Sequence, residues 1–148
     1  MRKPLVIMLV ALASCSSRGN DDTGDIDPVA DRVGDWESSI TPVNNSGVRG
    51  SAKAQSVGVG TGVTISIEGA AAGSQHPWHV HRGVCGDNGA IVGGASDYPV
   101  LSVNTGGNAS ANASINAALN ERESYYVNLH RSPSDLGTIV GCGPLSND

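Results

Sequence analysis

Four histidines carry the clearest chemistry in this sequence. Three lie in the run 76–81 (HPWHVH), and the fourth is His130. In an extended strand His79 and His81 point to the same face, roughly 6.5 Å apart, whereas His76 has the opposite parity. Two imidazoles on one face form a clamp for a metal ion, and His130 could supply a third ligand from another strand. Imidazole sites suit copper, zinc, iron or nickel, although a lone His-x-His pair is also typical of surface or packed histidines.

The segments that carry these histidines have the pattern of strands. Residues 63–68 (VTISIE), 109–115 (ASANASI) and 125–130 (YYVNLH) alternate between two faces. Shorter candidates are 38–43, 48–56 and 78–81, and turn-rich stretches separate them. Residues 116–123 could form a brief helical turn. Many short strands without a convincing amphipathic helix predict an all-β, antiparallel sandwich or barrel.

The first 14 residues predict a secretory signal peptide. Arg2 and Lys3 precede an apolar run over 5–13, which is too short to span a bilayer. Residues 12–15 (LASC) resemble the lipobox of bacterial lipoproteins, in which the cysteine, here Cys15, is lipidated and becomes the mature N-terminus. An ordinary signal peptide with a chance cysteine is the alternative. A single lipid anchor would hold the protein on a membrane without spanning it.

Composition sets the remaining limits on the chain. Residues 15–34 are polar and rich in aspartate, which predicts a flexible tether, and residues 35–148 are the right length for one β domain. The net charge of −5 argues against a nucleic-acid partner. The sequence does not specify an oligomeric state.

Two cysteines remain once Cys15 is assigned to the anchor. Cys85 and Cys142 in an exported domain predict a disulfide, because the compartments outside the cytoplasm are oxidising. Two free buried thiols are the alternative.

Three segments together resemble the Cu/Zn superoxide dismutase family. The run 76–81 is similar to the family's H-G-F-H-V-H, residues 127–137 (VNLHRSPSDLG) to V-V-H-x-x-x-D-D-L-G, and residues 141–143 (GCG) to A-C-G. Cys85 and Cys142 fall where the family has its disulfide. The similarity extends over roughly residues 36 to 145 and implies the Greek-key β-sandwich or barrel of that family.

The resemblance also implies a metal and its ligands. His79, His81 and His130 match the copper-binding histidines, and His76 and Asp135 match positions that support the site from nearby. We therefore expect one copper ion.

Several departures from the family bear on function. Asp97, within a segment similar to the family's D-L-P-x-L, matches a zinc ligand, but no histidine lies between Cys85 and Asp97. One carboxylate cannot make a zinc site, so zinc is not expected. Ser134 stands where the family has the aspartate that connects the two metals. Ile139 stands where it has the arginine that guides superoxide.

Arg82 and Arg131 directly follow two of the expected copper ligands. Either is a possible substitute guide for an anion, although strand parity argues against both.

Three functional hypotheses follow. The first is an envelope copper-dependent superoxide dismutase that converts superoxide to oxygen and hydrogen peroxide. The second is a non-catalytic copper-binding lipoprotein for storage, buffering or transfer, and the third is a metal-free structural relic of the fold. An aspartate directly after the lipidated cysteine retains a lipoprotein in the inner membrane. Ser16 occupies that position here, which favours the outer membrane facing the periplasm.

Overall fold

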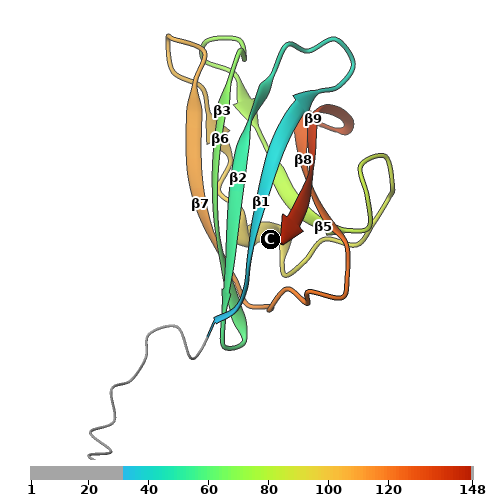
Figure 1. Ribbon diagram of the computed structural model, residues 1–148. Helices are drawn as coiled ribbons and strands as arrows, with labels where there is room; N and C mark the ends of the chain where they lie inside the picture. The colour runs from blue at the N-terminus through green and yellow to red at the C-terminus, as the bar shows by residue number, and fades with distance from the viewer. Residues whose placement is uncertain (1–31, 148) are drawn as a thin grey trace, which may run out of the picture.

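Seven strands form one curled antiparallel sheet, and its order is β5-β8-β9-β1-β2-β3-β7 (Figure 1). The computed structural model describes residues 32–147. A short two-stranded sheet pairs β4 with β6. The elements are β1 (Arg32–Pro42), β2 (Arg49–Val57), β3 (Gly60–Glu68), β4 (Gln75–His76), β5 (Trp78–Arg82), the 3-10 turn η1 (Ala95–Asp97), β6 (Leu101–Ser102), β7 (Ala109–Ile115), β8 (Tyr125–Ser132) and β9 (Asp135–Asn147).

The strand order confirms the predicted antiparallel β-sandwich or barrel. The last strand, β9, returns to lie beside β1, so the two ends of the described chain meet in the middle of the sheet. The sheet curls into half a barrel. The six predicted strands are all present; the one predicted over 38–43 begins six residues earlier, at Arg32, and the others shift by a few residues at most. The helical turn considered for residues 116–123 is absent, since this stretch forms only bends and a turn.

Alternation along the strands places the core inside the curl. In β3 the side chains of Val63, Ile65 and Ile67 are buried, whereas Thr64 and Ser66 are exposed. The two tryptophans, Trp36 of β1 and Trp78 of β5, are fully buried in the same core. One face of each of these strands therefore packs inward, as the period of two requires.

Strand β8 departs from this pattern, because all residues from Tyr125 to His130 are buried. Its odd-numbered residues face the core. Its even-numbered residues are covered on the outer side by the loop after β5, where the Tyr126 hydroxyl donates to the carbonyl of Asp87. The outer face of β8 is thus enclosed, and this enclosure creates the environment of the histidines.

A disulfide joins that covering loop to the sheet. Cys85 in the loop is bonded to Cys142 of β9 across 57 residues of sequence, which confirms the predicted pairing and removes the free-thiol alternative.

The signal peptide (1–14), Cys15 and most of the tether (15–34) lie outside the described residues, and β1 already begins at Arg32. Within residues 32–147 no helix has the length and apolar character needed to cross a membrane.

Candidate metal centre

Three histidines from two neighbouring strands converge on one point. His79 and His81 belong to β5 and His130 to β8, and one ring nitrogen of each lies within 4.8 Å of the others. The ring centroids are 5.0 Å apart for His79 and His130, 5.8 Å for His79 and His81, and 6.3 Å for His81 and His130. The convergence predicted from parity and from the separate position of His130 is therefore present.

Backbone carbonyls fix which nitrogen of two rings is free. The Nδ1–H of His81 donates to the carbonyl of Gly89 at 2.8 Å, and the Nδ1–H of His130 donates to the carbonyl of Leu136 at 2.6 Å. In a neutral imidazole the other nitrogen then carries a lone pair. The Nε2 of His81 is buried and has no hydrogen-bond partner in the described part of the chain. A carbonyl that orients a histidine in this way is the usual support of a metal ligand.

The third ring completes the donor set. The Nδ1 of His79 faces the Nε2 of His130 at 3.1 Å. Because His130 already donates from Nδ1, its Nε2 can only accept, so either a proton or a cation must lie between these two nitrogens. The residues present thus fit a metal ion held by Nδ1 of His79 and by Nε2 of His81 and His130. Three imidazoles make a donor set that copper and zinc both accept.

The environment keeps two of the three imidazoles, those of His79 and His130, neutral. Burial, together with smaller effects of the nearby rings of His130 and His81, lowers the pKa of His79 from 6.5 to about 4. Burial also lowers the pKa of His130, partly opposed by the hydrogen bond to the Leu136 carbonyl. Neutral imidazoles are the metal-binding form, so at neutral pH both rings are available as ligands.

Tyr126 and Gly89 hold the loop against His81. The phenol ring of Tyr126 stacks on His81, and its hydroxyl donates to the Asp87 carbonyl and accepts the Gly89 N–H. A Cβ at position 89 would lie 1.7 Å from the carbonyl oxygen of Arg82, so only glycine fits here. The carbonyl that orients His81 therefore depends on a glycine and a tyrosine that sequence reasoning did not single out.

Tyr98 forms the wall behind His79. Its ring meets His79 edge-on at 5.3 Å and Trp78 edge-on at 5.0 Å. Its hydroxyl donates to the carbonyl of Val92, and the Trp78 Nε1–H donates to the carbonyl of Pro99. These contacts fix the end of β5 from which His79 projects.

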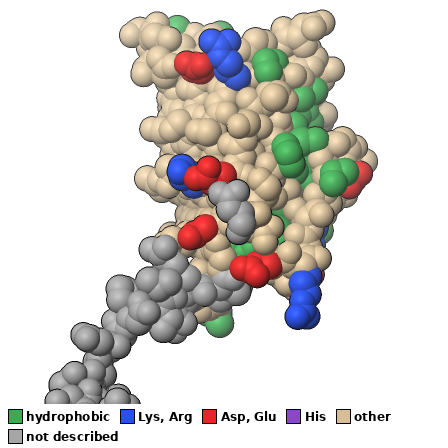
Figure 2. Space-filling view, viewed as in Figure 1, with side chains coloured by type: hydrophobic (Ala, Val, Ile, Leu, Met, Phe, Trp, Pro, Cys, Tyr) green, Lys and Arg blue, Asp and Glu red, His purple; other side chains and the backbone are tan. Residues whose placement is uncertain are grey.

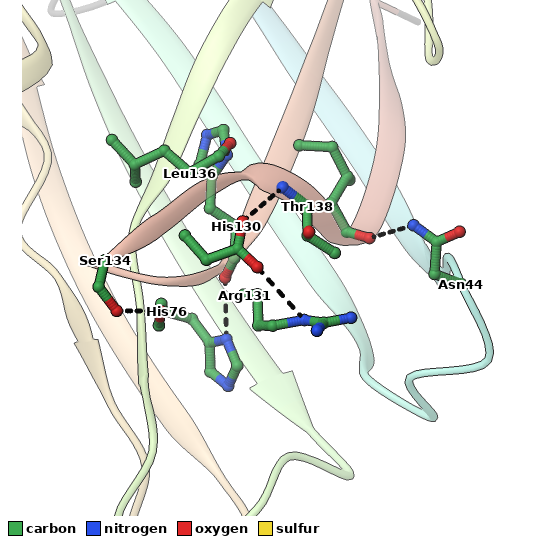
Figure 3. Close-up of polar contacts among 10 residues, drawn as sticks. Asn44, His76, His130, Arg131, Ser134, Leu136 and Thr138 are labelled. Carbon is green, nitrogen blue, oxygen red and sulfur yellow. Dashed lines mark hydrogen bonds and ion pairs between the residues drawn. The ribbon is translucent and has the colours of Figure 1, made fainter.

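The two supporting residues implied by the family resemblance lie in different places. The Nδ1–H of His76 donates to the backbone carbonyl of His130 at 2.9 Å, so His76 positions the strand that carries a ligand (Figure 3). The carboxylate of Asp135 accepts the Thr138 N–H and lies 3.7 Å from the Nε of Arg131, within the β8–β9 hairpin. Asp135 thus organises the hairpin around His130 without contacting the ring.

A pocket of about 590 Å³ opens beside the histidines. His81, His130, the disulfide, Asn128 and Ile139 are among its lining residues. No lysine or arginine of the described chain lines it. The face viewed in Figure 2 displays no histidine side chain, so the cluster does not open on that face.

The two arginines considered as anion guides point elsewhere. Arg82 forms an ion pair with Glu123 and lies over the ring of Tyr125 at 5.8 Å. Arg131 pairs with Asp135. Neither lines the pocket, as their strand parity indicated.

Asp97 and Ser134, which the family resemblance aligns with positions on the zinc side of the site, make contacts with residues close by in the sequence. Asp97 accepts the Gly94 N–H through its carboxylate, and the Ser134 hydroxyl lies 3.0 Å from that of Ser132. Among residues 32–147, His79, His81 and His130 are the one group of three ligand residues close enough to hold an ion.

Comparison with known proteins adds no family: no family model matches the chain, and no curated protein matches it either.

Proposed function

We propose that this protein binds one copper ion at His79, His81 and His130 and dismutates superoxide to oxygen and hydrogen peroxide. The observation that supports copper binding most directly is the set of three nitrogens within 4.8 Å, two of them oriented by backbone carbonyls. The resemblance of residues 76–81 and 127–137 to the Cu/Zn superoxide dismutase family supports copper as the metal and superoxide as the substrate.

Dismutation requires a redox metal, access for a small molecule and ligands held in place, and the residues around the cluster can provide each of these. His79, His81 and His130 would hold the ion, and the pocket beside His81 and His130 would admit a small molecule. When bound, copper would supply one-electron redox chemistry by alternating between Cu(II) and Cu(I). The hydrogen bonds to Gly89 and Leu136 hold the rings of His81 and His130 in fixed orientations.

One observation favours a second function, the non-catalytic storage, buffering or transfer of copper. The pocket lacks a cationic side chain among its described lining residues, and Ile139 is one of the side chains lining it. A local positive field raises the association rate of an anion by one or more powers of ten. Without it, the site would bind copper well and meet superoxide slowly.

Metal analysis and a dismutation assay test both functions. We expect the purified domain to bind one copper ion per chain, and His79→Ala and His130→Ala to abolish tight binding. Lys53→Ala changes an exposed residue paired with Glu37 far from the cluster and serves as the control. Superoxide removal above that of buffer-bound copper supports the dismutase, whereas stoichiometric copper without this excess supports the storage protein. No copper binding would leave only the structural relic.

We also propose that the mature chain is anchored in the bacterial envelope through lipidated Cys15, on the outer membrane and facing the periplasm. The lipobox-like residues 12–15 support this location. Labelling cells with a radioactive fatty acid tests it: wild-type protein should carry the label, and Cys15→Ala should not. An unlabelled wild-type chain would favour an ordinary signal peptide.

A further inference from the structure

Asn128 lies beside the three histidines, on the face of β8 that they occupy. In the sheet register it is directly opposite His79 of β5 on one side and Cys142 of β9 on the other. Directly opposed residues of antiparallel strands project to the same face, with Cβ atoms about 5 Å apart. The Asn128 amide therefore projects from the floor of the site, between a ligand residue and the disulfide.

This amide has no protein partner in the described chain and lines the pocket. Asn128 is only 7 % exposed, and its side chain makes no hydrogen bond within the described residues. It lines the pocket with His81 and His130. The buried side-chain atoms without a partner in the described chain are Ser38 Oγ and His81 Nε2, so the Asn128 amide keeps contact with the pocket and is accessible to a ligand there.

The other polar side chains of the pocket do not offer an equivalent group. The Asn44 amide donates to the carbonyl of Ile139, and the Asp87 carboxylate accepts the Val84 N–H. Asn88 is exposed. Among the described lining residues, Asn128 is thus the buried amide side chain without a hydrogen bond to the protein.

We propose that the Asn128 amide donates a hydrogen bond to a small anionic ligand held at the open position of the metal. This inference rests on the proposed metal binding and adds a specificity residue to it. The pocket has no lysine or arginine among its described lining residues, so the neutral Asn128 amide is the group that recognises a two- or three-atom anion. A hydrogen bond from a neutral donor to a charged acceptor is among the stronger ones in proteins.

Azide titration of the copper(II)-loaded protein tests the proposal, followed through the azide-to-copper charge-transfer absorption. Asn128→Val and Asn128→Thr form a matched pair, because valine and threonine have the same shape and differ by one hydroxyl. We expect the valine variant to bind azide about tenfold more weakly, the effect of one hydrogen bond to a charged group, and the threonine variant to stay close to wild type. Lys53→Ala, which lies outside the pocket, is the control and should not change azide binding.

Each outcome is decisive. If wild-type protein binds no copper, the proposed function fails together with this inference. If all variants bind copper and azide equally, or if valine and threonine weaken azide binding alike, copper binding stands and the role of Asn128 is wrong. Should Asn128→Val not fold, Asn128→Ala and Asn128→Ser provide the same comparison with and without a hydroxyl.

Discussion

The imidazole of His81 stacks on the phenol ring of Tyr126, with centroids 5.2 Å apart and planes inclined by 20°. The same tyrosine is bonded through its hydroxyl to Asp87 and Gly89, and the Gly89 carbonyl orients His81. The Tyr126 ring therefore packs against the face of His81, and its hydroxyl holds the loop whose Gly89 carbonyl accepts the His81 Nδ1–H.

Removing the Tyr126 hydroxyl separates the stacking on His81 from the hydrogen bonds that hold the loop. Tyr126→Phe keeps the stacking surface but frees the loop, and we expect copper affinity to fall about tenfold, the lower end of the range for groups that support a metal ligand. Competition against a chelator of known affinity measures the change. Tyr125→Phe removes a neighbouring hydroxyl that bonds Glu123 and is the matched control. Equal affinities for Tyr126→Phe and wild type would contradict the role given to the loop.

Gly89→Ala tests the position of the loop itself. The added Cβ would overlap the Arg82 carbonyl, so the backbone at position 89 must move away from β5. We expect weaker copper binding and altered Cu(II) electron paramagnetic resonance, because His81 loses its carbonyl partner. Gly58→Ala lies in the β2–β3 turn, where a Cβ meets nothing within 4 Å, although its φ of +57° is a left-handed one. It should lower stability slightly and leave the copper spectrum unchanged.

Acid destabilises the metal-free protein through its buried histidines. The pKa of His79 falls from 6.5 to about 4 on folding, so the unfolded chain binds a proton that the folded chain rejects between these values. The free energy of unfolding should therefore stay flat above pH 6.5 and decline as the pH falls from 6.5 toward 4. Urea denaturation at a series of pH values measures this slope, and His79→Gln should make it shallower. An unchanged slope in that variant would assign the effect to other groups.

The disulfide makes a separate contribution to stability. Replacing Cys85 and Cys142 together by serine should lower the free energy of unfolding by about 4 kcal/mol, the chain-entropy value for a loop of 57 residues. Chemical denaturation of the oxidised wild type and the double variant provides the comparison. A loss below about 1 kcal/mol would mean that the unfolded chain is already compact around these cysteines.

Much of the fold could be predicted because its strands alternate clearly, as β3 and β7 do. The long strand β9 was missed, since Gly137, Gly141 and Gly143 interrupt the alternation and hide a strand that contacts both β1 and β8. The three ligands could be predicted from parity and from the family resemblance.

The supporting side chains could not be predicted, because their roles depend on long-range packing. Tyr126 and Asn128 sit at polar-face positions of an alternating strand, where solvent exposure is the ordinary expectation. They are buried because a loop that begins more than forty residues earlier folds over them and is bonded to Cys142.

The placement of β5 has a mechanical consequence. It is the outermost strand of its side of the large sheet, where it pairs with β8, and its other edge is hydrogen-bonded to the short loop segment 90–92. An ion shared by these two strands would cross-link the border of the sheet to its neighbour. Copper loading should then slow amide hydrogen exchange in residues 78–82 far more than in the central strands β1 and β2, which makes the border strand a reporter of metal occupancy.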